Sequence, residues 1–291
     1  MEDNRMQCIF CGAGKVSSYF IKETDAGNYP IVHCESCLSA YVWPRPGRAE
    51  MDAYYSSAEY VHADLESLEN PNAGYYPSSM DDARKMISEC RKLAGGGLFL
   101  DIGAGFGEFS KVAGEQGFEV TACEPSPTSR EQFYKMTGFE ALPDVVDKDY
   151  ADINRGRFDV VLLSQVLEHI SDPEEVVENI HALLKPGGIA AIGVPHFGSL
   201  VSRIQGRGDM YISPPEHLNF FSCKGLSAIF ERSRFTVEKV ETVSKIPRNK
   251  IEAKVKLPVV AQLAWMLPYG LLKSSEWFGK GMIINAYFRK H

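Results

Sequence analysis

The sequence has no excess of positive charge. Its 31 lysine and arginine residues are outnumbered by 38 aspartate and glutamate residues, which gives a formal net charge of −7. A protein that binds nucleic acids in general must neutralise phosphate groups with a basic face. The composition therefore argues against nucleic acid as the partner of this chain.

Long apolar segments are also missing. The opening residues are polar, so we expect no secretion signal, and no apolar run reaches the ~18 residues that a membrane-spanning helix requires. The chain has seven cysteines, an odd number that does not suit a framework of disulfides. We therefore expect a cytoplasmic protein whose cysteines serve as thiols or metal ligands.

Four of the cysteines form two C-x2-C pairs. Cys8 and Cys11 make the first pair, and Cys34 and Cys37 make the second. Two such pairs complete the closed tetrahedral shell of a structural zinc site. Strand-like runs between the pairs indicate a ribbon whose core is too small to fold without a stabilising metal ion. We predict a zinc ribbon over residues 1–45, with unliganded thiols or a redox C-x-x-C motif as alternatives.

A glycine-rich loop gives the clearest functional signal. An apolar strand predicted from Leu98 runs into the loop, and a helical pattern follows it over residues 108–116. Such a loop lies at the carboxyl edge of a parallel sheet, where open α/β sheets bind their ligands, and glycine lets the backbone approach the ligand closely. The candidate residues are Asp101, Gly103, Ala104, Gly105 and Gly107.

The next predicted strand, residues 119–123, ends in a carboxylate. This residue, Glu124, can accept hydrogen bonds from two neighbouring ribose hydroxyls. The loop has G-x-G-x-G spacing, whereas a dinucleotide site has G-x-G-x-x-G, so an oxidoreductase with a dinucleotide cofactor is disfavoured. The loop and Glu124 together indicate a nucleoside-containing ligand.

From this loop onwards the chain resembles the class I S-adenosylmethionine-dependent methyltransferases. Phe158–His169 resembles that family's fourth strand and the segment after it, and Asp172–Val194 resembles the following helix and fifth strand. The resemblance implies a doubly wound, Rossmann-like α/β fold with a seven-stranded, mostly parallel sheet. Phe235–Val243 and Gly281–Phe288 would be strands six and seven, and the last would be antiparallel.

The same resemblance implies the cofactor, S-adenosylmethionine, and the roles of individual residues. Gly103, Ala104 and Gly105 would lie against the methionine part, and Glu124 would hold the ribose. Ser164 and Gln165 would flank the sulfonium, and Asp101 would orient the loop or the amino group of the cofactor. The preceding ribbon also resembles a bacterial subgroup that often methylates sugars or other small metabolites.

The acceptor side carries one candidate catalytic residue, His217. It lies just before a predicted helix, 224–232, and an imidazole with a pKa near neutral can take a proton from a hydroxyl group. The alternative is that His217 only caps the predicted helix or packs against neighbouring side chains. A general base is not essential in that case, because proximity and orientation supply most of the acceleration of methyl transfer from a sulfonium. We expect a small-molecule, sugar or lipid-linked acceptor, with O-methylation favoured. A catalytically inactive, methyltransferase-like module that contacts a partner through its ribbon is the alternative function.

The remaining segments are a helical connector, 46–97, and an apolar insertion within the methyltransferase domain, 98–291. The insertion covers about residues 245–280. From Lys245 to His291 the chain has nine basic and two acidic residues, a formal charge of +7. Basic and aromatic residues around an apolar segment suit a helix at a membrane surface. The segment is therefore a candidate for peripheral membrane contact, and a hydrophobic lid or a dimer contact is equally open from the sequence.

Overall fold

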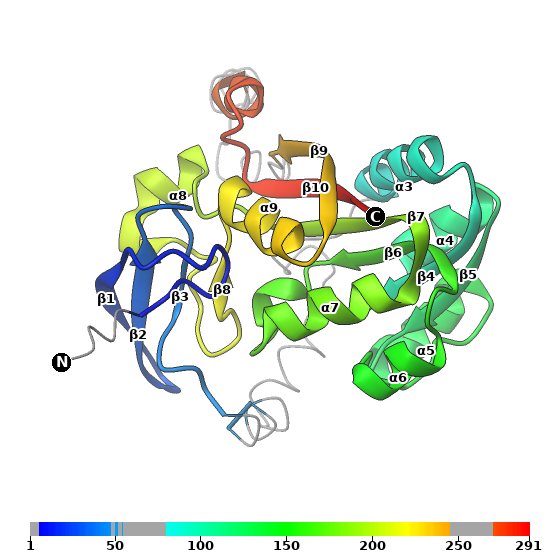
Figure 1. Cartoon of the computed structure of the whole chain (residues 1–291), viewed down its shortest axis with the longest axis horizontal. Helices are drawn as coiled ribbons and strands as arrows, with labels where there is room; N and C mark the ends of the chain where they lie inside the picture. The colour runs from blue at the N-terminus through cyan, green and yellow to red at the C-terminus, as the bar shows by residue number, and fades with distance from the viewer. Residues whose placement is uncertain (1–5, 48–49, 52–53, 55–79, 245–269) are drawn as a thin grey trace, which may run out of the picture.

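The larger sheet of the computed structural model contains six strands (Figure 1). The model describes residues 6–47, 50–51, 54, 80–244 and 270–291. The strands are β4 (Gly97–Ile102), β5 (Phe118–Cys123), β6 (Phe158–Ser164), β7 (Leu184–Pro195), β9 (Phe235–Val243) and β10 (Ile283–Lys290). They are ordered β5-β4-β6-β7-β10-β9; the first four are parallel, and β10 is antiparallel to β7 and β9.

Helices cover both faces of this sheet, which confirms the doubly wound fold. Phe99, Val160 and Leu162 are buried against α3 and α4, while Leu100 and Val161 belong to the core shared with α6, α7 and α9. This alternation follows from the two-residue period of a strand. The helices are α3 (Met80–Ala94), α4 (Glu108–Glu115), α5 (Pro127–Thr137), α6 (Lys148–Ile153), α7 (Pro173–Leu183), α8 (Leu200–Gln205), α9 (Cys223–Arg232) and two 3₁₀ helices, Leu167–His169 and Gly206–Gly208.

The prediction of seven strands was wrong for the described residues, which form six. In place of the missing strand there is one parallel bridge between Cys123 and Leu142. Leu142 donates its N–H to Ala122 O and accepts from Glu124 N, at 2.8 and 2.9 Å. Within the described residues this segment makes no further pairing with β5 beyond the single bridge.

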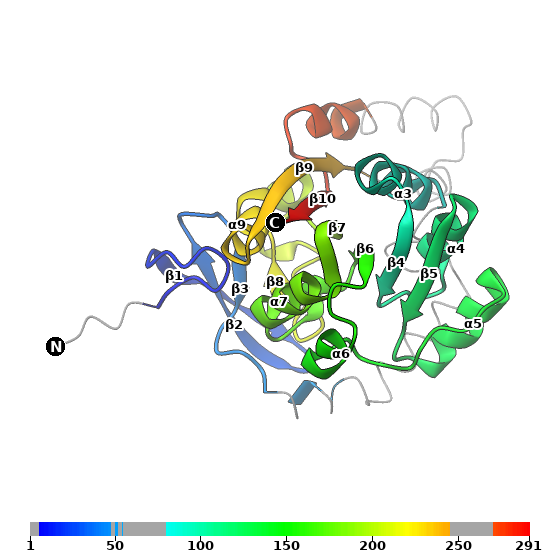
Figure 2. The same ribbon diagram turned by 45° about the vertical axis from the view of Figure 1, so that its right-hand side comes forward.

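The N-terminal ribbon forms a second sheet, and one of its strands, β8, comes from the main domain. It contains β1 (Val16–Thr24), β2 (Gly27–Cys34), β3 (Ala40–Val42) and β8 (Asn219–Phe220), in that order and all antiparallel. Figure 2 shows these ribbon strands beside β8 and α9. The expected division at residue 45 therefore cuts through a sheet that both parts of the chain build.

Ribbon and main domain also share one hydrophobic core. The ring of Phe10 lies 4.7 Å from that of Phe221, and Phe10 belongs to the same buried cluster as Leu226 and Phe230 of α9. Nη1 of Arg232, at the end of α9, donates to the carbonyl oxygens of Ile9 and Phe10, both at 3.2 Å. The cysteine pairs are thus anchored on α9.

Arg45 ties the exit of the ribbon to the main domain. Its guanidinium donates to the carbonyl oxygens of Ser171 at 3.0 Å, Leu218 at 2.9 Å and Ile170 at 3.3 Å, and to the side chain of Asn219. The Asn219 amide in turn donates to Ile170 O at 2.8 Å. One half-buried side chain therefore joins the ribbon, the segment after β6 and the segment before β8.

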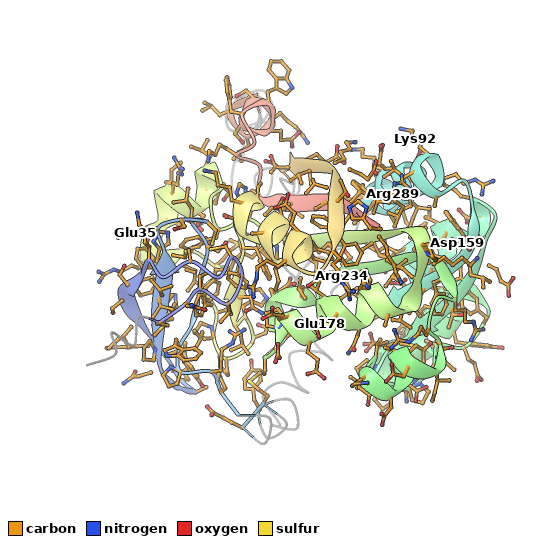
Figure 3. All side chains as sticks on the ribbon, viewed as in Figure 1. Glu35, Lys92, Asp159, Glu178, Arg234 and Arg289 are labelled. Atoms are coloured by element: carbon orange, nitrogen blue, oxygen red, sulfur yellow. The ribbon has the colours of Figure 1, made fainter. Side chains whose placement is uncertain are left out.

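The amino edge of the main sheet lies away from the ribbon. Figure 3 shows Asp159, near the start of β6, at the opposite side of the molecule from Glu35 of the ribbon. Asp159 accepts from Leu98 N and from Lys185 Nζ, both at 2.7 Å. The carboxyl edge of the parallel strands, where the glycine loop lies, consequently faces the ribbon side.

The connector and the insertion are described only in part. Residues 48–49, 52–53, 55–79 and 245–269 lie outside the described residues, so most of both predicted segments is not tested. Residues 270–277 are helical. Within the described ranges no helix is long and apolar enough to span a bilayer.

Gly225→Ala is expected to lower the free energy of unfolding by about 1–3 kcal/mol, because overpacking strains the ribbon contact. An added Cβ would lie 2.0 Å from Ser39 Oγ, which hydrogen-bonds Ser222. Gly114→Ala, in α4, is the matched control, since no atom lies within 4 Å of its added Cβ. The control should be neutral or stabilising by up to ~1 kcal/mol. Equal urea midpoints for the two variants would contradict the packing described here.

Candidate functional site

A cavity of about 660 Å³ opens at the carboxyl edge of the main sheet. One end is lined by the glycine loop and Asp101, and the other by Glu168, His169 and His217. Ser164 and Gln165 line the part between the two ends. The crevice lies where β4 has β5 on one side and β6 on the other, the point of an open α/β sheet at which ligands bind.

The backbone of the glycine loop is shaped for close approach. Gly103 has a φ of 69°, and an added Cβ would lie 2.5 Å from Val166 Cγ2. Gly103 N and Ala104 N both donate to Cys123 O, at 2.9 and 3.1 Å. Gly105 has a φ of 53° and no atom within 4 Å of an added Cβ, so a ligand can reach its backbone.

Asp101 lies buried at the loop end of the cavity. It is 2% exposed and accepts a hydrogen bond from Ser110 Oγ at 2.6 Å. Burial raises its pKa to about 7. A cationic amino group of a ligand would stabilise the ionised carboxylate, which agrees with the predicted role of Asp101.

Two of the predicted cofactor residues do not line the cavity. Glu124 accepts from Gly105 N at 2.8 Å and from Ser126 N at 2.9 Å, so its carboxylate stabilises the backbone of the glycine loop. The contact of Glu124 with the ribose stays a prediction. Gly107 starts α4 with a φ of 94°, and its added Cβ would lie 2.8 Å from the side chains of Phe133 and Thr137. Gly107 therefore allows the start of α4 to pack closely on α5.

The acceptor end of the cavity contains two histidines in contact. The ring centroids of His169 and His217 are 4.7 Å apart, with an interplanar angle of 79°. Nδ1 of His217 lies 2.9 Å from Tyr211 O, and Nδ1 of His169 lies 2.9 Å from Glu216 O. Because a carbonyl oxygen only accepts, each Nδ1 must donate, which leaves each Nε2 with a free lone pair. Burial lowers the pKa of both rings, that of His169 to about 3, so both are neutral.

Glu168 is a functional candidate to which the sequence analysis assigned no role. It is 1% exposed, and among the described residues neither carboxyl oxygen has a hydrogen-bond partner. Burial raises its pKa to about 8. Its backbone oxygen accepts from Leu218 N at 2.8 Å, which holds the residue against the segment before β8. The sequence signal was the adjacent Glu-His pair directly after the segment that flanks the predicted sulfonium.

The four paired cysteines converge as predicted. Cys8 Sγ lies 3.7 Å from Cys37 Sγ, Cys11 Sγ lies 3.7 Å from Cys34 Sγ, and all four sulfurs are within 4.8 Å of one another. A disulfide would bring two sulfurs to about 2.05 Å. A tetrahedral shell with Zn–S bonds of about 2.3 Å has edges of about 3.8 Å. The two separations of 3.7 Å are close to the edge of such a shell and far longer than a disulfide bond.

Comparison with known sequences gives a consistent picture. Residues 75–240 match the model of a family described as a methyltransferase domain. The ubiquinone biosynthesis O-methyltransferase of Caulobacter vibrioides is 38% identical over 98 residues, 31% of this chain and 37% of that protein. The Pseudomonas aeruginosa protein of the same name is 33% identical over 106 residues, 35% of this chain and 45% of that protein. The chain thus aligns with less than half the length of these relatives.

Solved structures share the fold at low sequence identity. A S-adenosylmethionine-dependent methyltransferase from Archaeoglobus fulgidus has a TM-score of 0.53 and 20% identity, covering 73% of this chain and 95% of that one. The 1,6-didemethyltoxoflavin-N1-methyltransferase of Burkholderia thailandensis, with S-adenosylhomocysteine bound, has a TM-score of 0.55 and 17% identity. It covers 94% of this chain and 99% of its own. These similarities support the doubly wound fold.

Glu124→Ala is expected to weaken binding of S-adenosylhomocysteine by ~1–3 kcal/mol, because it removes a charged acceptor from the glycine loop and from the predicted ribose contact. Titration calorimetry of the purified chain measures this directly. Glu119→Ala, an exposed position of the same strand, is the control and should bind like the unaltered chain. Equal affinity of the two variants would refute the assignment of Glu124.

Proposed function

The chain belongs to the methyltransferase-domain family, and on this premise we propose that it transfers a methyl group from S-adenosylmethionine to a hydroxyl group of a small molecule. The observation that carries the proposal is the continuous cavity, which joins the glycine loop to His217 past Ser164 and Gln165. Methyl transfer requires the sulfonium and the acceptor oxygen to meet in line, and a single cavity with two chemically different ends suits this need.

At the cofactor end, the methionine part lies along Gly103, Ala104 and Gly105, where the backbone can be approached closely. The buried carboxyl group of Asp101 faces the amino group. Ser164 and Gln165, at the end of β6, flank the sulfonium. This arrangement directs the methyl group towards the acceptor end of the cavity.

At the acceptor end, His217 is the catalytic residue. The acceptor oxygen attacks the methyl carbon, the bond between that carbon and sulfur breaks, and S-adenosylhomocysteine leaves. Nε2 of His217 takes the hydroxyl proton and later releases it to solvent, since Nδ1 is held by Tyr211 O. A catalytically inactive binding module has less support, because its cavity would need neither the open glycine loop nor two neutral imidazoles.

The ribbon cysteines bind one structural zinc ion. Four thiolates close the tetrahedral shell, so no position is left for water or substrate. The support for this site is the 3.7 Å separation of the sulfurs in two pairs. The ion would stabilise the ribbon sheet, which includes β8 next to His217.

The proposal extends to a more specific acceptor, one linked to a lipid, which the chain would meet at a membrane surface. Leu271, Trp277 and Phe278 are 62%, 88% and 78% exposed at the end of the predicted insertion 245–280. Two neighbouring exposed aromatic side chains beside basic residues suit insertion among lipid headgroups. Such contact would bring the cavity to an acceptor carried by a lipid.

The chain is expected to sediment with anionic vesicles more than with neutral ones, and less so as salt rises, because basic residues add electrostatic attraction to apolar insertion. A double variant, Trp277→Ser with Phe278→Ser, should lose most of this binding. Sedimentation of vesicles containing phosphatidylserine or only phosphatidylcholine measures both effects. No binding to either vesicle, or unchanged binding of the double variant, would reject membrane contact through this helix.

His217→Ala is expected to lower turnover ~10²–10⁴-fold while affinity for S-adenosylhomocysteine stays nearly the same. The assay follows transfer of a labelled methyl group to a panel of hydroxylated small molecules and lipids. His181→Ala, a helix α7 position outside the cavity lining, is the matched control. A loss below ~3-fold would make His217 a packing residue. The absence of any O-methylated product across the panel would count against the proposed function.

A further inference from the structure

The acceptor end of the cavity holds a carboxyl group that the proton transfer does not use. Glu168 is 1% exposed, and both of its oxygens lack partners within the described part of the chain. A carboxylate that is buried without a partner is strongly destabilising, so such a group is usually protonated, paired or bound to a metal. Glu168 is also among the residues that line the cavity.

Two imidazoles lie beside this carboxyl group. One ligand atom from each of Glu168, His169 and His217 lies within 4.8 Å of the other two. Nδ1 of each ring is engaged by a backbone carbonyl, of Glu216 for His169 and of Tyr211 for His217. Histidines that bind metals commonly donate their second ring N–H to a carbonyl in this way, which orients the other nitrogen.

We propose that Glu168, His169 and His217 bind a divalent transition-metal ion at the acceptor end of the cavity. Two imidazoles and one carboxylate form the ligand set of catalytic zinc and of non-haem iron sites, and they leave coordination positions open. The cysteine cluster, in contrast, closes its shell with four sulfurs. The chain would therefore carry two metal sites of different kinds, one structural and one at the substrate.

This inference rests on the proposed O-methylation and specifies its acceptor. The open positions suit a hydroxyl group with a second oxygen on the neighbouring carbon, because both oxygens could coordinate the ion. A bound ion would lower the pKa of the hydroxyl group, so that its proton could pass to solvent as the oxygen attacks the methyl carbon and the carbon–sulfur bond breaks. With the ion bound, His217 acts as a ligand; without it, His217 takes the proton directly.

The test is the zinc content of the full chain after dialysis against dilute zinc and removal of free ions. The unaltered chain should hold two zinc ions. Glu168→Gln, which keeps the shape of the side chain but not its charge, should hold one and show at least a ~10-fold weaker second binding step. Cys11→Ser should lose the other site. Binding of S-adenosylhomocysteine to Glu168→Gln with unchanged affinity is the control for folding.

One zinc ion in the unaltered chain, or two in Glu168→Gln, would overturn the inference. These results separate it from the proposed function. Methyl transfer by a chain with zinc only at its cysteines would leave the function standing and remove the second site. Two bound zinc ions, without O-methyl transfer to any hydroxylated compound, would support the second metal site and contradict the proposed function. His169→Gln provides a second variant if Glu168→Gln does not fold, and it too should hold one zinc ion.

Discussion

The pairing of β3 with β8 holds the acceptor side of the cavity in place. Only two residue pairs form this contact, Ala40 with Phe220 and Tyr41 with Asn219. Yet His217 lies two residues before β8, and Leu218 N binds the backbone of Glu168. A displacement of β8 would move both walls of the acceptor end. The ribbon, which otherwise resembles an appendage, is therefore part of the site.

Neighbouring contacts reinforce this pairing from both sides. Ser39 Oγ donates to Ser222 Oγ at 3.1 Å, and the Ser222 hydroxyl donates to Cys37 O. Arg45 fixes the other side through Ile170, Leu218 and Asn219. Because methyl transfer gains most of its rate from proximity and orientation, a rigid acceptor segment has a direct chemical use. The glycine loop is held separately, by the sheet edge and by Glu124.

Local sequence patterns predicted the parts of the fold whose signals are local. The glycine loop, α9 and strand β9 agree with their predicted residues, since each depends on periodicity or spacing within a few positions. Strand β8 could not be predicted. It has two residues, too few for a pattern, and its partner β3 lies almost 180 positions earlier in the chain. The absence of a seventh strand could not be predicted either, because the family resemblance favoured seven strands and no local pattern shows that this segment pairs through one bridge only.

Site residues could be predicted where their role follows from residue type and spacing. They could not be predicted where their role follows from burial in the folded chain. The cysteine cluster and the cavity position of His217 followed from motifs. Burial of the Glu168 carboxyl group arises from the long-range contact with Leu218, which no local pattern reveals. Glu124 was predicted as a residue of the cofactor site. It does contact the glycine loop, through Gly105 N, but it does not line the cavity.

Hydrogen–deuterium exchange before and after zinc removal tests the central claim most directly, namely that the ribbon holds the acceptor segment. The structure predicts that removal of zinc increases exchange in residues 27–42 and 209–222, because the amides of Val42 and Leu218 lose their partners. Residues 97–116, which include the glycine loop, should keep their protection. Unchanged exchange in 209–222, or an equal loss of protection in 97–116, would contradict the claim.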